Sequence, residues 1–394
     1  MDFTPSEEQT EAQGLAARIL GDLSTHDRLV AAGTGTDAGL WKELCAAGLP
    51  AAVEETGLLG LVLLLEEQGR TTAQVPLASS AVYGLLAVAR HGTDEQRARL
   101  LPAFRDGTAV AAGAFPGRGT VRAEGDARLS GTVAVVPWLR DATHVLVADA
   151  DRALWFVTTA DPGVLIEPVE TTAPWSAGRL VLSGAPAERL GGPAASQEAT
   201  RGPATPGEGT GGSEACAGST ERPDASGEAT GGPAACAGAT GRPGAYADVL
   251  AIARTAFAGL QAGVCAGSLA RAIAHTAGRQ QFGRPLDHRQ AVLLRAADAY
   301  MDTEAIRVTA YEAAWRHDAG LPYAAQALTA AWWASEAGKR VVHAGQHLHG
   351  GTGADLDHPV HRHFLWGRQL DAHLGCGSEV LQELGELLVK EGPE

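Results

Sequence analysis

A helical apolar repeat in the second half of the chain sets the strongest limit on its fold. Apolar residues from Val249 to Val264 follow one another at steps of three or four residues, which places them on one face of a long helix. An apolar face of that length must be covered by other helices to be removed from water. The repeat therefore predicts a helical bundle over residues 246–394.

Further helices are expected in the same part of the chain. One should follow Pro285, because proline favours the first turn of a helix, and a second should contain Tyr311 and Trp315. Another should run from about Tyr323 to His347, and a last one should cover Glu379–Lys390.

Residues 1–112 also follow a helical pattern. Thr4 or Ser6 can cap a first helix, and an apolar stretch over Leu58–Gln68 predicts a helix buried on all sides. Thr93, followed three residues later by Gln96, has the order of a capping box at the start of another helix. We therefore expect an N-terminal helical domain.

The period changes between residues 113 and 190. Short runs rich in Val, Leu and Ile are separated by Gly, Asp and Pro, a pattern typical of a small antiparallel β-domain. The runs cover residues 128–136, 143–148, 154–158, 164–166 and 179–183.

Residues 191–245 are of low complexity. Gly, Ala, Pro, Thr, Ser and Glu dominate the segment, and bulky apolar residues are missing from it. Such a segment cannot bury enough surface to offset the entropy of ordering its backbone. It is predicted to be a disordered surface insertion.

Charge and cysteine content exclude several classes of function. A net charge of −15 argues against binding to nucleic acid or to an anionic membrane surface. The five cysteines are scattered and lack C-x-x-C spacing, which favours reduced thiols and a cytoplasmic location. The polar start of the chain has no pattern of a secretory signal, and the apolar run over residues 57–65 is too short to span a bilayer.

The stretch from His275 to Gln290 carries side chains suited to a cofactor. Arg279 offers a bidentate donor for a phosphate, Phe282 offers an aromatic face, and Gly283 permits a sharp turn. The alternative is an arginine that caps the end of the long helix.

The order of helical, β and helical parts, together with seven motifs, resembles the acyl-CoA dehydrogenase family. This resemblance implies an α+β multidomain fold with an N-terminal α-helical domain, a small antiparallel β-domain and a C-terminal four-helix-bundle domain. The motifs are MDFTPSEEQ at the start, Trp41–Leu44 with Ala47–Leu49, Leu65–Arg70 with Val75–Pro76, His91–Gln96 with Leu101–Pro102, Leu129–Thr132, Arg279–Gly283 with Gln290, and Gln346–Gly353.

The resemblance also implies FAD as cofactor and a dimer-based assembly. In the family, the R-x-x-F-G arginine and the Q-x-x-G-G segment reach across a subunit interface to the FAD of a neighbour. The residues that match these cofactor-binding positions are Arg279, Gln281, Phe282, Gln290, Gln346, Gly350 and Gly351.

The implied reaction is FAD-dependent α,β-desaturation of an acyl-CoA or acyl-carrier thioester, in fatty acid or steroid metabolism. A carboxylate must remove the α-proton, and its pKa is raised in a desolvated site. The chain departs from the family here, because the usual catalytic position falls on Leu374 or Gly375 and the alternative position falls near Ala253. The W-[IV]-[TS] motif that meets the flavin ring is also altered to Val135–Pro137, with Trp138 one step late.

Three hypotheses follow from the missing glutamate. The chain is an acyl-CoA dehydrogenase, either as a homodimer or homotetramer or as one subunit of a hetero-oligomer with a second dehydrogenase subunit. Alternatively it is a related flavoprotein with a different base, or a non-catalytic partner or scaffold subunit.

Nearby carboxylates are the candidates for a base of the chain's own. Asp248 lies closest to the long-helix position, and Glu379 and Asp371 flank the C-terminal position. The alternative for each is a charge at a helix end. No metal site is predicted, because His343 and His347 have the spacing of helical ligands but no H-E-x-x-H pattern accompanies them.

Overall fold

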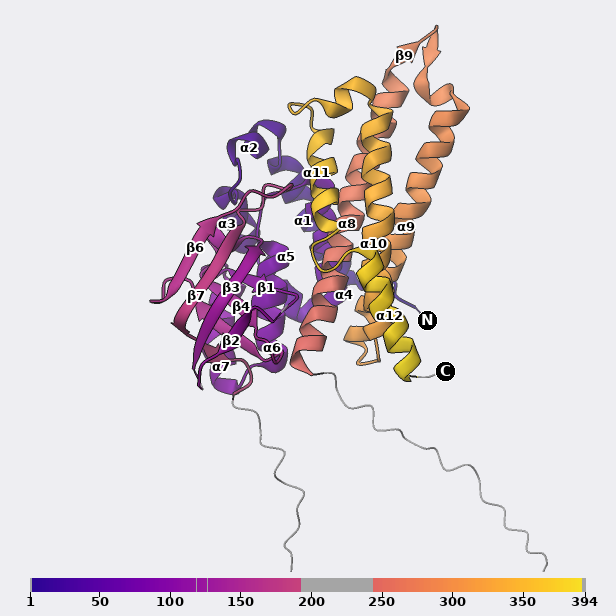
Figure 1. Ribbon diagram of the computed structural model, residues 1–394. Helices are drawn as coiled ribbons and strands as arrows, with labels where there is room; N and C mark the ends of the chain where they lie inside the picture. The colour runs from indigo at the N-terminus through magenta and orange to yellow at the C-terminus, as the bar shows by residue number, and fades with distance from the viewer. Residues whose placement is uncertain (1, 118, 126, 193–243, 392–394) are drawn as a thin grey trace, which may run out of the picture. The chain divides into compact units, whose positions relative to one another are not determined.

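The computed structural model describes residues 2–117, 119–125, 127–192 and 244–391 (Figure 1). The predicted insertion at residues 191–245 therefore lies almost wholly outside the described residues. The expected order of a helical part, a β part and a second helical part is confirmed.

The N-terminal part is helical, and the sequence located two of its helix starts. Ser6 caps α1 and exchanges hydrogen bonds with Gln9, and Thr93 caps α7 and exchanges them with Gln96. Both pairs are complete capping boxes, which satisfy N–H groups that the first helical turn leaves free. The elements are α1 (Glu7–Leu23), α2 (His26–Ala31), α3 (Ala38–Ala46), α4 (Leu49–Thr71), α5 (Leu77–Ser79), η1 (Ser80–Leu86), α6 (Ala87–His91) and α7 (Asp94–Arg105).

Helix α4 is longer than the predicted apolar stretch, Leu58–Gln68, and it is kinked just before that stretch begins. Gly57 breaks the helix with a φ of 73° and a ψ of −166°. The N–H groups of Leu58 and Leu59, which the break leaves without helical partners, donate to the Asp318 carboxylate at 2.8 and 2.9 Å. Because Asp318 ends a helix of the C-terminal part, this cap joins the two helical parts.

Two four-stranded sheets form the β part. Their strand orders are β1-β4-β5-β8 and β2-β3-β7-β6. All strand pairs of the two sheets are antiparallel except β1 and β4, which run parallel. In the sequence, β2 and β3 of the second sheet come between these two strands. The strands are β1 (Ala111–Ala114), β2 (Val121–Ala123), β3 (Arg128–Val136), β4 (His144–Ala148), β5 (Leu154–Thr158), β6 (Val164–Pro168), β7 (Gly178–Pro186) and β8 (Glu188–Arg189), with a 3-10 turn η2 (Leu139–Asp141).

The C-terminal part is a bundle built around α8, as the apolar repeat predicted. One expectation was wrong: the helices placed after Pro285 and around Tyr311 are one continuous helix, α9, and Pro285 lies in a strand before it. Nothing between residues 290 and 318 stops the helix, because that stretch contains neither Gly nor Pro. The elements are α8 (Ala245–Gly278), β9 (Gln280–Gln281), β10 (Arg284–Pro285), η3 (Leu286–His288), α9 (Gln290–Asp318), α10 (Ala324–Leu348), η4 (Gly350–Ala354), α11 (Val360–Leu370) and α12 (Gly377–Glu391).

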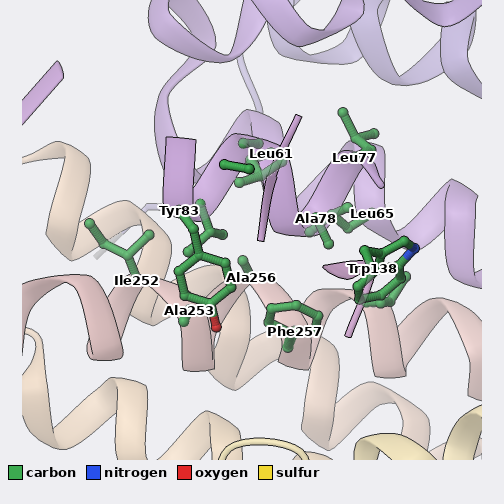
Figure 2. Packing of buried hydrophobic residues seen from close by; sticks show 14 of the residues in the cluster. Leu61, Leu65, Leu77, Ala78, Tyr83, Trp138, Ile252, Ala253, Ala256 and Phe257 are labelled. Carbon is green, nitrogen blue, oxygen red and sulfur yellow. The ribbon is translucent and has the colours of Figure 1, made fainter. Parts of the chain in front are cut away.

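Glycines let α8 lie against the backbone of α4. A Cβ atom added to Gly263 would lie 2.0 Å from the carbonyl oxygen of Glu66, and one added to Gly267 would lie 2.3 Å from that of Arg70. Apolar side chains pack beside this contact, and Figure 2 shows Leu61 of α4 and Ala256 of α8 among them.

Helix α8 is also apolar enough to resemble a membrane span. Its most apolar window has a mean hydropathy of 1.5, and 89% of that window is buried inside the structure. Burial of that extent is typical of the core helix of a packed bundle.

We predict that Gly263→Ala lowers the free energy of unfolding by about 3 kcal/mol, because neither backbone can move aside for the methyl group without opening the bundle. Denaturant unfolding of the full chain measures the change. The control is Gly385→Ala on α12, where an added Cβ meets no atom within 4 Å. That variant should be neutral or more stable, and equal losses in both variants would contradict the close α4–α8 contact.

Candidate functional site

The R-x-x-F-G segment forms a β-hairpin at the end of α8. Gln281 pairs with Arg284, and the two residues between them, Phe282 and Gly283, have φ angles of 53° and 80°. Two consecutive left-handed residues form the tight turn that matches the twist of paired strands. Arg279 is the C-cap residue of α8, so it stands at the base of this hairpin.

The hairpin projects away from the rest of the bundle. Figure 1 shows β9 beyond the ends of α8 and α9. The Phe282 side chain is 91% exposed, and the Arg289 guanidinium lies over its ring at 5.2 Å. Within the described ranges, Arg279 and Arg284 form no ion pair. The hairpin therefore presents an aromatic ring and unpaired cations to a molecule outside the chain.

The Q-x-x-G-G segment lies beside the base of the hairpin. His349, at the end of α10, stacks on His275 of α8 with ring centroids 4.6 Å apart. Gln346 is half-buried and donates to the carbonyl of Gly353 at 3.2 Å. Gly350 and Gly351 are exposed, and an added Cβ on either would meet no atom within 4 Å, so a group from outside can reach their backbone.

The structure thus brings most of the predicted cofactor-binding residues to one end of the bundle. Arg279, Gln281 and Phe282 are exposed there, and Gln290 is exposed as the first residue of α9. Arginine and amide donors beside open glycine backbone suit a pyrophosphate, and an exposed ring suits a planar group. These residues fit an FAD that approaches from outside the chain.

The interior cleft between the β part and the bundle has the opposite character, because aromatic side chains fill it. Trp138, just after β3, stacks on Trp175 with centroids 4.6 Å apart and an interplanar angle of 17°. The ring of Phe257 on α8 lies 6.4 Å from the Trp138 ring and 4.5 Å from the ring of His373. Figure 2 shows Phe257 beside Trp138. Trp366 completes the cluster by packing its edge against Trp175 at 5.4 Å.

Little space remains beside this aromatic cluster. A cavity of about 20 Å³ lies there. It is lined by Arg254 and Phe257 of α8, by His373 and Leu374 after α11, and by small or apolar residues of α10 and α11. That volume holds about one water molecule. A flavin ring or an acyl chain does not fit a cavity of this volume.

Within the described residues, three polar atoms of the cluster have no hydrogen-bond partner. They are the indole nitrogens of Trp175 and Trp366 and the Nε2 atom of His373. Burial lowers the pKa of His373 to about 4, so the ring is neutral at ordinary pH. A neutral ring can remain among aromatic side chains, whereas a charged one would need a counter-ion.

No carboxylate occupies either position of the family's base. Leu374 and Ala253 are buried, and Gly375 has no side chain. Arg254 reaches this place instead, donating to the Leu374 carbonyl at 3.4 Å and pairing with Glu383 of α12 at 2.7 Å. A guanidinium cannot accept a proton at neutral pH, so it cannot serve as the base.

Asp248 is placed as a structural carboxylate. Its side chain is bound by Arg90 at 2.8 Å, His91 at 2.8 Å and Tyr323 at 2.7 Å, which joins α6, α8 and the start of α10. Burial would raise the pKa of Asp248, but the hydrogen bonds from His91, Tyr323 and Arg90 outweigh it and hold the pKa well below its usual value. Such a carboxylate is a poor general base.

The two C-terminal candidates are also held by local contacts. Glu379 is exposed in the first turn of α12 and accepts the N–H of Cys376 at 3.2 Å. Asp371 accepts from the Ser335 hydroxyl at 2.6 Å and pairs with Arg368 at 3.1 Å. Across the described part of the chain, no group of three or more His, Cys, Asp or Glu side chains could hold a metal ion.

The aromatic cluster was not anticipated from the sequence. Trp138, Trp175 and Trp366 come from distant segments and follow no local pattern. The one available signal was Trp138 itself, displaced by one step from the position expected for a flavin-contacting residue.

Two family models match the chain. The acyl-CoA dehydrogenase N-terminal domain matches residues 6–108, and the acyl-CoA dehydrogenase C-terminal domain matches residues 244–381. Among curated relatives, the chain is 31% identical to acyl-CoA dehydrogenase FadE27 of Mycobacterium tuberculosis, over 99% of each chain.

Solved structures of related proteins cover nearly the whole chain. The Tcur3481-Tcur3483 steroid ACAD variant is 38% identical with a TM-score of 0.81, over 98% of both chains. The ChsE4-ChsE5 complex from Mycobacterium tuberculosis is 28% identical with a TM-score of 0.82, over 100% of both chains.

We predict that Asp248→Asn lowers the free energy of unfolding by about 3 kcal/mol, because it removes the buried charge that Arg90, His91 and Tyr323 share. Urea unfolding measures the loss. Asp94→Asn is the control, since the Asp94 side chain is 98% exposed and its ion pair with Arg97 should contribute little. Unchanged stability together with lost catalytic turnover would restore Asp248 as a candidate base.

Proposed function

Because this chain belongs to the acyl-CoA dehydrogenase family of FAD-dependent oxidoreductases, we propose that it is one subunit of a hetero-oligomeric acyl-CoA dehydrogenase. In this proposal the chain helps to bind an FAD that lies mainly in a partner subunit, and the partner supplies the catalytic base. The observation that carries the proposal is the contrast between the open, outward donors of the hairpin end and the filled interior cleft.

The related structures support an assembly of two different subunits. ChsE4-ChsE5 is named as a complex, and Tcur3481-Tcur3483 is named for two gene products. The second is also called a steroid ACAD, so we extend the proposal to a coenzyme A thioester with a steroid-derived acyl group.

The surface of α9 supports a subunit contact. Leu293, Leu294, Tyr300 and Met301 are each more than half exposed near its start. A groove of about 840 Å³ between α9 and α10 adjoins them, with a floor that includes Ala299 and a rim of charged side chains. Exposed apolar side chains that gather along one helix are typical of an interface rather than of a free surface.

The chain's own residues have defined roles in this proposal. A bound FAD would supply the acceptor for the hydride lost from the β-carbon of the thioester. Arg279 pairs with the cofactor's pyrophosphate, Gln281 and Gln346 donate amide hydrogen bonds, and Phe282 packs on a planar part of the cofactor. Open backbone at Gly350 and Gly351 permits close approach.

Proton removal must be supplied from elsewhere. Arg254 and Leu374 stand where a carboxylate would be needed, and the aromatic cluster excludes the substrate. The carboxylate that takes the α-proton is therefore assigned to the partner subunit.

The described cysteines, Cys45, Cys265 and Cys376, are free thiols, which supports a cytoplasmic location.

Flavin content tests the proposal most directly. The chain should be colourless when purified alone and should join a yellow complex when co-expressed with a dehydrogenase subunit that retains the glutamate, with fewer FAD molecules than chains. Oxidation of acyl-CoA thioesters by that complex would follow. A chain that binds stoichiometric FAD alone would contradict the split site, and a colourless complex would favour the scaffold alternative.

We predict that Arg279→Ala weakens FAD retention by the complex about tenfold or more, because it removes a charge-assisted contact to phosphate. The fluorescence of the flavin that is released during dialysis measures retention. Arg179→Ala is the matched control, because Arg179 lies on β7 in an exposed pair with Glu167 and away from the hairpin. Equal retention in both variants and in the unmodified complex would overturn the assignment of Arg279.

A further inference from the structure

Three histidine rings from three segments meet where η4 joins the bundle. His275 lies near the end of α8, His349 caps α10, and His358 lies in the loop before α11. The rings of His275 and His349 are stacked at 4.6 Å with an interplanar angle of 28°, and the rings of His349 and His358 meet edge-on at 5.0 Å.

Hydrogen bonds fix two of the rings. The Nδ1 atom of His349 lies 2.7 Å from the Gly345 carbonyl, so that nitrogen carries the proton. The Nδ1 atom of His358 accepts the N–H of Val360 at 3.2 Å, so that nitrogen is free of a proton. This arrangement suits neutral rings, whose stacking needs no counter-ion.

The surroundings oppose protonation of His275 and His358. Burial lowers the pKa of His275, and the nearby His349, His358 and Arg279 lower it further. Burial also lowers the pKa of His358, with His349 and Arg271 adding to the effect and Asp355 opposing it. The charged or titratable groups around the cluster are Arg271 and Arg279 on α8, His26 on α2, Asp355 in the loop, and His361, Arg362 and His363 on α11.

The rings flank η4, which is also held by the hydrogen bond from Gln346 to the Gly353 carbonyl at 3.2 Å. Gly350 and Gly351 have open space around them, and Gly353 is the buried residue of η4. Thr352 donates to the His349 carbonyl at 2.8 Å, so the position of η4 depends on the position of His349.

We propose that His275, His349 and His358 form an acid-sensitive latch that holds η4 against the end of α8. At neutral pH the stacked rings hold the segment closed. Acidification places positive charges on His275 and His358, which both contact the His349 ring and lie beside Arg279 and Arg271, and the segment opens.

The direction of the pH effect follows from proton linkage. The rings of His275 and His358 bind protons less readily in the closed segment than when exposed, so the closed segment holds fewer protons than the open one. The latch is fully closed above the ordinary imidazole pKa. Its stabilisation is lost as the pH falls from that value through the lowered pKa values.

The consequence for function rests on the proposed function above. Gly350, Gly351 and Arg279 are the residues assigned to a partner's FAD, and they flank the latch. Opening of the latch would withdraw these contacts, so the assembled complex would release FAD in mildly acidic conditions.

Hydrogen exchange of the full-length chain tests the latch without flavin. Exchange is compared at about pH 7.5 and about pH 5.5, with a correction for the intrinsic chemical exchange rate at each pH. Amides 346–358 should then exchange about fivefold faster or more at the acidic pH. Amides of α4 serve as the internal reference for global unfolding. An equal response in α4 and in the latch segment, or no response in either, would overturn the proposal.

Two variants and one control separate the latch from a general effect of acid. His275→Phe keeps a stacked ring without titration, and His358→Asn keeps an acceptor for the Val360 N–H. Both should lose most of the acid response. His144→Phe is the control. His144 lies on β4, where its ring packs on Phe104 of α7, and burial lowers its pKa as well. A full response in the His275→Phe chain would overturn the latch.

Flavin release from the complex forms the second arm. Faster release at about pH 5.5 than at about pH 7.5, reduced by His275→Phe, supports the coupling of latch and cofactor. If the segment opens in acid while flavin release stays unchanged, the latch stands and the assignment of this end to FAD fails.

Discussion

The contact between α4 and α8 supports the rest of the structure. Gly263 and Gly267 bring the backbone of α8 against the carbonyls of Glu66 and Arg70, closer than any side chain would permit. Gly338 and Gly345 of α10 make similarly close approaches to Gln261 and Ser268 on another side of α8. With α8 fixed between two helices, its far end carries the hairpin, the histidine latch and the donors directed outward.

Ionic contacts reinforce this arrangement without contributing chemistry. Glu66 is buried and binds Arg307 at 2.8 Å and the Tyr311 hydroxyl at 3.1 Å, which ties α4 to α9. Burial raises the pKa of Glu66, while Arg307 and Tyr311 act in the opposite direction. Asp248 and Asp318 join the two helical parts in the same way. Asp248, the candidate base nearest the long-helix position, is therefore a connector between helices.

The proposed function separates cofactor binding from proton chemistry in space. The hairpin end is exposed and cationic, whereas Trp138, Trp175 and Phe257 pack together in the interior, near the positions where the resemblance places the catalytic base. Stacked indoles offer the same planar, apolar contact that a flavin ring would, so the cleft is stable without a ligand. In the proposed function, the subunit keeps its fold while its contribution to catalysis lies at its surface.

The sequence alone determined the order of the parts, two capping boxes, the family and the residues of the outward end. These features depend on local patterns and short motifs, which side-chain spacing reveals. Tertiary structure alone decided that α9 is continuous, that β1 and β4 run parallel, that Asp248 is saturated by three donors and that three distant tryptophans fill the cleft. Each of these features depends on contacts between residues far apart in the chain. No local repeat or short motif in the sequence indicates such a contact.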